Sequence, residues 1–325
     1  MFCQYFSVMI KEQNPNSVLF ENKENHSIRL KITQKCPWEC IFCHKEGGWD
    51  IDDMRWDDAM RKNISLLKEN LKLEEAHLTG GEPTSSRYIE ELAEGLISLG
   101  LDVKLTSNGQ FSEKKLNGLI EKGIKEFNFS IHALNSEDFI KMQKKKNLSW
   151  ANNCIENQKN IITKAQELGA RIKLNVVIGG EEDIEKALQI FDFAKNLRIP
   201  LKFLSDLFKK EISMQTIEKI AIEILGGEKF KETIEKGGSN KSSYYRDKDG
   251  FEFGVKSIRE NKLKSLCSDC NEKCLEQFYG IRLEQREGRF YVRLCIDRKD
   301  GKNLMLVEDF LESEYFKEIN KTINE

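Results

Sequence analysis

Three cysteines crowd one short stretch of the sequence, ITQKCPWECIFCHKEGG, which covers residues 32–48. Cys36, Cys40 and Cys43 follow the spacing C-x3-C-x2-C. A disulfide framework needs an even number of cysteines, and a tetrahedral zinc site needs four ligands, which His44 is too close to Cys43 to complete easily. Three thiolates can instead hold three irons of a four-iron, four-sulfur cluster and leave the fourth iron open for an exogenous ligand.

A second group of cysteines lies near the end of the chain. Cys267, Cys270, Cys274 and Cys295 follow the spacing C-x2-C-x3-C-x20-C, and the last returns after the hairpin-like stretch EQREGRFY. Such a set suits a zinc ribbon or an iron–sulfur cluster, because thiolates bind both metals. We favour a second iron–sulfur cluster of the [4Fe-4S] type, because one cluster motif already precedes it. Cys3 and Cys154 are interpreted as ordinary thiols.

The composition predicts a soluble protein of the reducing cytoplasm. Its 325 residues are 39% hydrophobic and 33% charged, with a net charge of −2. This balance predicts a soluble protein with no general attraction to nucleic acid or membrane. We find no signal peptide in MFCQYFSVMIKEQ and no apolar run long enough to span a bilayer. Clustered cysteines favour a reducing compartment and metal ligation.

Apolar residues that alternate or recur predict strands and helices in turn. Six strands are predicted at 27–33, 76–81, 102–109, 126–134, 171–180 and 200–205. Helical spacing is found over 60–71 and in the segments 88–99, 113–122, 153–168 and 183–196. Repeated strand and helix predict an α/β fold with a parallel sheet, closed as a partial (β/α)6 TIM-like barrel. We expect an N-terminal extension (1–26), the barrel (27–205), a helical and loop connector (206–262) and a small C-terminal domain (263–325).

Polar residues follow the predicted strands where the functional loops of such barrels lie. Gly80 and Gly81 let the backbone approach a ligand closely, and Glu82 offers a carboxylate to a cation or an amine. Ser107, Asn108 and Ser130 suit a ribose or a carboxylate. His132 either touches a cofactor or caps a strand, whereas His44 and His77 are interpreted as structural.

The first cysteine motif followed by GGEP resembles the radical S-adenosylmethionine (SAM) superfamily. The resemblance implies that the open iron binds the methionine part of SAM and that the reduced cluster cleaves SAM to a 5′-deoxyadenosyl radical, which abstracts hydrogen from a substrate. By the same resemblance, Cys36, Cys40 and Cys43 ligate the cluster. SAM contacts are implied for Phe42, Gly80, Gly81, Glu82, Ser107, Asn108, Ser130, His132, Val177, Ile178 and Gly179. A structural zinc knuckle is the alternative.

Much of the chain, from residue 28 to about 310, also resembles the radical GTP cyclase family of molybdenum-cofactor biosynthesis (the MoaA type). LTGGEPT, LTSNG, FNFSIHALNSEDF, IKLNVVI, YYRDKDGFEFGV and CSDC carry this resemblance. It implies a small Twitch/SPASM-like auxiliary-cluster domain at the C-terminus. It also implies substrate contacts for Arg29, Lys173, Asn175, Lys202 and Arg282.

Departures from that family predict a different substrate. NEKCLEQFYGIRL replaces an arginine-rich run and adds Cys274, which would close the auxiliary cluster. Glu75 replaces a basic residue and would repel phosphate. The family ends in a Gly-Gly tail, whereas this chain ends KTINE. We therefore expect a paralogue that does not cyclise GTP.

Besides a divergent GTP cyclase of molybdenum-cofactor biosynthesis, three function classes remain open from the sequence. The favoured one is a radical SAM enzyme acting on a nucleotide- or nucleoside-like small molecule, with flavodoxin or ferredoxin as the electron donor. A maturase of a ribosomally made peptide is the second, although 26 residues before the barrel are few for a leader-binding domain. A zinc-stabilised binding protein is the third. The stretch 236–250 is interpreted as a mobile loop, with Arg246 as a candidate anion contact.

Overall fold

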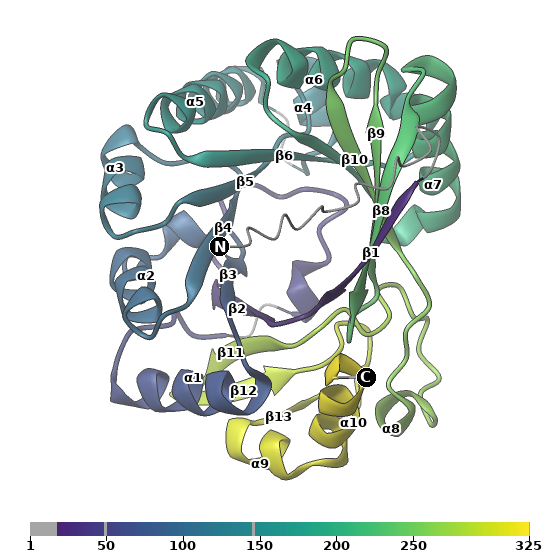
Figure 1. The fold of residues 1–325 in the computed structure, drawn as a ribbon. Coiled ribbons are helices and arrows are strands. Elements are labelled where there is room, and N and C mark those ends of the chain that lie inside the picture. Colours follow the sequence, from purple (N-terminus) through teal and green to yellow (C-terminus); the bar gives the residue numbers. More distant parts are fainter. Residues whose placement is uncertain (1–17, 49–50, 145–146, 325) are drawn as a thin grey trace, which may run out of the picture.

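Six parallel strands form the centre of the computed structural model, which describes residues 18–48, 51–144 and 147–324. These strands are β2 (Ser27–Thr33), β3 (Glu75–Gly80), β4 (Asp102–Ser107), β5 (Glu126–Ser130), β6 (Arg171–Ile178) and β7 (Leu201–Ser205). They lie in the order of the chain and curve into a partial barrel with helices outside (Figure 1). The six predicted strands and the α/β class are confirmed.

Helices separate the barrel strands and cover their outer side. They are α1 (Asp58–Leu71), α2 (Ile89–Ser98), α3 (Glu113–Glu121), α4 (Ser136–Lys141), α5 (Leu148–Glu167), α6 (Ile184–Leu197) and α7 (Lys210–Glu218). Local chemistry explains where they begin; for example, the Asp57 side chain accepts a hydrogen bond from Met60 N and caps α1. Short 3-10 turns follow the strand ends at η1 (Lys45–Gly47), η2 (Pro83–Ser85), η3 (Glu181–Asp183) and η4 (Leu207–Lys209).

Each barrel strand has one apolar face and one polar face. In β2, Ile28, Leu30 and Ile32 are fully buried in the main hydrophobic core, which also holds the apolar residues of α1. Because side chains alternate along a strand, Arg29 and Lys31 point to the opposite side, into the barrel. The core therefore lies between the strands and the helices, and the inside of the barrel is lined by charged and polar groups.

Further strands extend the sheet beyond β7. They are β1 (Leu19–Glu24), β8 (Glu228–Lys236), β9 (Asn240–Arg246) and β10 (Glu252–Ile258), and β10 pairs in parallel with β7. The expected helical and loop connector over 206–262 is corrected here: α7 and a π-helix, η5 (Lys219–Ile224), are followed by three strands. Alternation in KFKETIEK and NKSSYYR is the strand signal that the Gly- and Ser-rich composition of the segment obscured.

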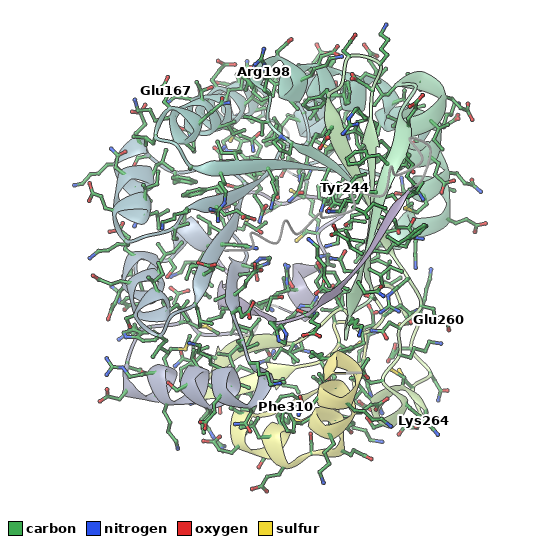
Figure 2. The ribbon with its side chains drawn as sticks, viewed as in Figure 1. Glu167, Arg198, Tyr244, Glu260, Lys264 and Phe310 are labelled. Atoms are coloured by element: carbon green, nitrogen blue, oxygen red, sulfur yellow. The ribbon has the colours of Figure 1, made fainter. Side chains whose placement is uncertain are left out.

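The C-terminal part extends the other edge of the sheet. Strand β11 (Arg282–Arg286) pairs in parallel with β2, and β12 (Arg289–Arg293) and β13 (Leu304–Leu306) follow. In Figure 1, helix α9 (Val307–Glu312) lies below these strands, and α10 (Glu314–Asn324) and α8 (Lys264–Cys267) lie to their right. Leu283, Val292 and Phe310 belong to the same buried cluster as the barrel core, and Phe310 is labelled in Figure 2. The barrel and this part therefore share one core.

No helix in the described segments is long and apolar enough to cross a membrane.

Candidate active site

The three-cysteine loop follows β2 and rests on a small hydrophobic core of its own. Trp38 lies in the loop and packs edge-on against Phe139, with the ring centroids 4.9 Å apart. Cys36, Cys40 and Phe42 pack against the same apolar cluster, to which α4 and α5 contribute. Cys154 is 5% exposed within it and so behaves as the small apolar residue that the sequence predicted. Cys3 lies outside the described residues.

The sulfur atoms of this loop are partly removed from water. Burial raises the pKa of Cys36 to about 12 and that of Cys40 to about 11, and it also raises the pKa of the Cys43 thiol. A buried thiolate needs a compensating positive charge, and metal ions supply one. Amide groups face two of the sulfurs, because Gln143 Nε2 lies 3.3 Å from Cys40 Sγ and Asn108 Nδ2 lies 3.8 Å from Cys36 Sγ. The residues present fit an iron–sulfur cluster.

Gly80 and Gly81 bring the end of β3 against the cysteine loop. A Cβ on either residue would collide with main-chain oxygens of Thr33 to Lys35. Gly80 also has φ = +130°, which side chains rarely adopt. The two glycines thus let the end of β3 pack closely against the chain that leads into the cysteine loop. The sequence predicted a different role for them, the close approach of the backbone to a ligand. Gly81 N and Glu82 N donate to Thr33 O and Lys35 O at 2.8 and 2.7 Å.

Glu82 is 1% exposed, and its carboxylate is bonded within the protein. Oε1 accepts from Thr84 N, Thr84 Oγ1 and Ser107 Oγ, and Oε2 accepts from Asn108 N at 2.6 Å. Burial nevertheless raises the pKa of this carboxyl group. The geometry gives Glu82 and Ser107 the task of joining the ends of β3 and β4, which differs from the SAM contact expected of their side chains.

The remaining predicted SAM residues gather at the same end of the barrel. Phe42 meets the His132 ring edge-on, with the centroids 4.8 Å apart, and His132 Nδ1 accepts from Val177 N at 3.3 Å. Burial and the Lys186 charge lower the pKa of His132 to about 3, so the ring is neutral. Ile178 is fully buried in the core, so only its main chain can face a ligand. Gly179 N donates to Asp183 Oδ2 at 2.6 Å.

Two buried glutamines hold this site together, and the sequence analysis missed both. Gln143 contacts Cys40, as described above. Gln158 Nε2 donates to Asn108 O at 2.7 Å and to Ser130 O at 2.9 Å, and so joins the ends of β4 and β5. Each glutamine is 2% exposed. A polar residue on an apolar helix face was the available signal for Gln158; nothing local distinguished Gln143.

The four C-terminal cysteines line one cavity of about 90 Å³. Cys267 belongs to α8, Cys270 and Cys274 to the loop after it, and Cys295 follows β12. Asp297 Oδ2 accepts from Leu275 N and Glu276 N, and Asp297 N donates to Cys295 Sγ at 3.3 Å. Arg298 donates to Leu266 O and to carboxylates of Asp269 and Asp300. The structure therefore brings the predicted set together.

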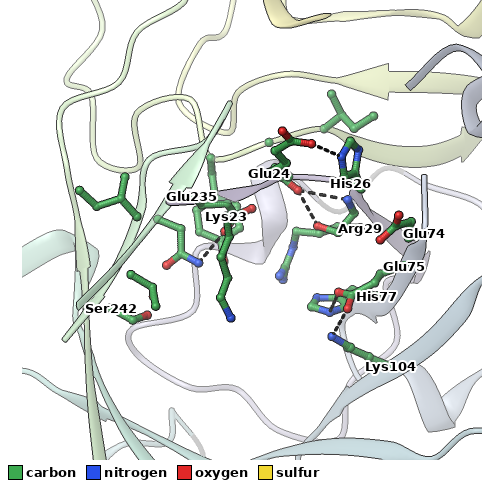
Figure 3. Close-up of a pocket in the computed structure, with 18 of the residues that line it drawn as sticks. Lys23, Glu24, His26, Arg29, Glu74, Glu75, His77, Lys104, Glu235 and Ser242 are labelled. Atoms are coloured by element: carbon green, nitrogen blue, oxygen red, sulfur yellow. Dashed lines mark hydrogen bonds and ion pairs between the residues drawn. The ribbon is translucent and has the colours of Figure 1, made fainter. Parts of the chain in front are cut away.

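A larger cavity, of about 330 Å³, lies inside the barrel towards the amino ends of its strands (Figure 3). Arg29, Glu75 and His77 line it from β2 and β3, and Lys104 from β4. Lys202 of β7 faces it across from them, beside Ser242 and Tyr244 of β9; Tyr244 is labelled in Figure 2. Glu75 Oε1 accepts from Lys104 Nζ at 2.6 Å. The cavity wall is charged, with both signs present.

The five predicted substrate residues divide into two groups. Arg29 and Lys202 line the barrel cavity, whereas Lys173, Asn175 and Arg282 are not among its lining residues. Lys173 Nζ bonds with Glu126 Oε1 at 2.7 Å. Arg282 is 1% exposed and pairs with Glu46 and Glu276. Arg246 is the exposed last residue of β9 and pairs with Glu252, so the interpretation of 236–250 as a mobile loop is corrected.

Lys202 carries the least compensated charge in this cavity. Burial and the charges of Lys256, Lys173 and Lys23 lower its pKa to about 7. Its Nζ lies 3.5 Å from Ser242 Oγ, and the described residues include no carboxylate in an ion pair with it. A buried ammonium without a counter-charge favours an anionic ligand.

One short segment separates the two cavities. Gln277 and Phe278 line the four-cysteine cavity, and Tyr279, Gly280 and Ile281 line the barrel cavity. Lys256 Nζ lies 4.4 Å from the centroid of the Tyr279 ring, and Arg29 Cζ lies 5.5 Å from it. The four-cysteine group thus lies directly behind the wall of the substrate-sized cavity.

Comparisons with known proteins agree with this arrangement. The sequence profile of the Radical SAM superfamily matches residues 30–194. The solved structure of a histidine-tagged anSMEcpe with bound AdoMet shares the fold, with a TM-score of 0.55 at 12% identity over 94% of this chain and 84% of that one. The chain belongs to the Radical SAM superfamily.

Within that superfamily the chain is an enzyme of the MoaA-like kind, similar to GTP 3′,8-cyclases. It is 28% identical to the GTP 3′,8-cyclase of Aquifex aeolicus in an alignment of 300 positions that covers 88% of this chain and 87% of that protein. It is 27% identical to the cyclase of Nautilia profundicola in an alignment of 316 positions that covers 87% of this chain and 93% of that protein.

Proposed function

We propose that this radical SAM enzyme acts on a small anionic molecule of the nucleotide or nucleoside type, bound in the barrel cavity. The observation that carries the proposal is the uncompensated Lys202 facing a 330 Å³ cavity inside the barrel. Cavities of roughly 300–1,000 Å³ suit small ligands, which favours a small molecule over a peptide. Arg29 Nε, His77 Nε2 and Asn240 Oδ1 are buried there without hydrogen-bond partners. A polar ligand in the cavity would provide the missing hydrogen-bond partners.

Cys36, Cys40 and Cys43 would hold a [4Fe-4S] cluster with one open iron, and the loops after β3 to β6 would hold SAM. When bound, this pair supplies reductive cleavage of the sulfonium bond and hydrogen abstraction from the substrate. The protein's part is to exclude water with Trp38 and Phe42, to keep His132 neutral beside the site, and to hold the substrate rigidly, because misplacement by about 1 Å can cost about a hundredfold in rate.

The four C-terminal cysteines would hold a second cluster, closed by Cys274. The four cysteines surround one cavity, where each thiolate could take one iron of a cluster. A single zinc ion with the same four ligands is the alternative. A closed cluster would not bind the substrate directly.

Cyclisation of GTP is the second candidate, favoured by the names of the relatives. We expect no turnover of GTP, because Glu75 stands in the cavity wall and Arg282 is committed to Glu46 and Glu276. The test incubates the reduced enzyme with GTP and SAM and follows the pterin product. Robust formation of that product would establish the cyclase.

The proposed substrate class is tested with a panel of nucleosides and nucleotides. The anaerobically reconstituted enzyme should release 5′-deoxyadenosine faster when its substrate is present. Lys202→Met should raise the KM for that substrate by about ten- to a hundredfold, the range expected for one charged hydrogen bond. Lys195→Met is the matched control and should leave KM unchanged, because Lys195 lies on α6, pairs with Asp247 and does not line the cavity. Equal effects of both variants would contradict the assignment.

A further inference from the structure

Residues 142–144, directly after α4, bind the main chain of the cysteine loop, although Cys40 and Gln143 are 103 positions apart in the chain. Ile41 N donates to Met142 O at 2.9 Å, and Lys144 N donates to Glu39 O at 3.0 Å. Cys40 and Gln143 face each other in an isolated antiparallel bridge. The main chain thus fixes where the Gln143 side chain begins.

Hydrogen bonds also fix which end of the Gln143 amide faces the sulfur. Its Oε1 accepts from Glu39 N at 2.9 Å, so the oxygen is committed to the main chain. The amino group Nε2 therefore points at Cys40 Sγ, 3.3 Å away. With Gln143 2% exposed, water does not compete strongly for this contact.

We propose that Gln143 is a positioning residue that sets the reduction potential of the first cluster through an N–H···S bond to Cys40. This inference rests on the proposed function, because it requires the cluster at Cys36, Cys40 and Cys43. Hydrogen bonds to ligand sulfurs withdraw negative charge from them and stabilise the reduced cluster, which carries one more electron. The Gln143 amide would thereby raise the reduction potential of the first cluster.

Among the described residues, Cys40 receives the shorter of the two side-chain amide contacts to the sulfurs of this loop. The comparable amide contact to Cys36, from Asn108, is longer at 3.8 Å. Cys43 lies on the exposed side of the loop. One buried donor from a distant segment thus faces a partly buried ligand sulfur.

The test is an anaerobic potential titration of the full chain, followed by electron paramagnetic resonance. Addition of SAM identifies the signal of the first cluster, because only that cluster has an iron open to it. Gln143→Met keeps a long, unbranched side chain and removes the donor. Its equilibrium between oxidised and reduced cluster should shift at least tenfold towards the oxidised form, which is about 59 mV for one electron.

Gln166→Met is the control with the same substitution. Gln166 lies near the C-terminal end of α5, where its Nε2 donates to Leu197 O, and among the described residues it makes no contact with the cysteine loop or with the residues that face it. This variant should leave the potential unchanged. An equal shift in both variants, or an unshifted Gln143→Met with full iron content, would overturn the proposal.

A second variant separates tuning from construction of the site. In Gln143→Glu, a protonated carboxyl group can still donate to the sulfur, whereas an ionised one cannot. Its potential should therefore return towards the wild-type value as the pH falls, a trend absent from the wild type. Loss of iron from both variants, with an unaltered potential in the clusters that remain, would show a purely structural role. A wild-type protein that forms no first cluster would overturn the proposed function itself.

Discussion

The two cysteine regions are held in different ways. The first loop lies on an apolar cluster around Trp38 and Phe139, and its sulfurs receive amide groups from distant parts of the chain. In the second region, Cys267 and Cys295 pack against the main core, and charged side chains hold the rest: Arg298 and Asp297 bind carbonyls, amides and carboxylates around the four cysteines. Apolar packing suits a site that excludes water from radical chemistry, whereas the charged side chains hold the loop of the second cysteine region in place.

The largest expected effect breaks the first region. Replacement of Cys36, Cys40 and Cys43 by Ala should abolish reductive cleavage of SAM, because each substitution removes an iron ligand. The measurement is the yield of 5′-deoxyadenosine and methionine from the reduced protein. Full cleavage by the triple variant would exclude this loop as the cluster site.

Breaking the second region should have a smaller and separable effect. Replacement of Cys267, Cys270, Cys274 and Cys295 by Ala should lower the iron content by about half, while the first cluster remains. Iron and sulfide analysis measures this loss. Stoichiometric zinc in wild-type protein matured with ample iron would favour the zinc ribbon instead.

A third prediction concerns the connection between the two regions. Glu46 follows Cys43 by three residues, and its carboxylate bridges Arg29 of β2 at 2.5 Å and Arg282 of β11 at 2.7 Å. These two cations hold the pKa of Glu46 well below its usual range. Glu46→Leu would leave two buried guanidinium groups short of a partner and should destabilise the fold by about 3–5 kcal/mol.

Thermal and denaturant unfolding measure the effect of Glu46→Leu. The matched control is Glu182→Gln, which removes an exposed ion pair with Lys209 and should cost about 0–1 kcal/mol. If Glu46→Leu were no more harmful than this control, the bridge would contribute little to joining the two regions.

The smallest effect lies between the regions, at His77 in the cavity wall. Burial, Arg29 and Lys104 lower its pKa from 6.5 to about 3. Between pH 6.5 and about pH 3, the unfolded chain therefore binds a proton on this ring and the folded chain does not. The contribution of His77 to the free energy of unfolding is complete above pH 6.5 and is lost as the pH falls towards 3. His77→Gln should flatten this part of the pH dependence of unfolding. An unaltered slope would mean that His77 is protonated in the fold.

Local pattern made the barrel predictable from the sequence. Strands such as β2 and β6 show alternation within a few residues, and α1 shows helical spacing together with the Asp57 cap. The spacing of Cys36, Cys40 and Cys43 indicated the cluster motif because all three lie in one loop. The strands β8 to β10 escaped prediction because their Gly- and Ser-rich turns resemble a loop in composition.

The sequence by itself determined the superfamily chemistry: the cysteine groups, the glycines after β3 and the order of strands and helices. Only the tertiary structure decided which polar groups meet. Gln143 reaches Cys40, and Glu46 reaches Arg282 across 236 positions, because folding brings together segments whose separation leaves no local pattern. The same holds for Glu82, whose carboxylate accepts hydrogen bonds from Ser107 and Asn108. It also holds for Lys202, which folding buries without a paired carboxylate among the described residues, so that its pKa is lowered. Side-chain roles of this kind depend on burial and on partners, which exist only once the chain has folded.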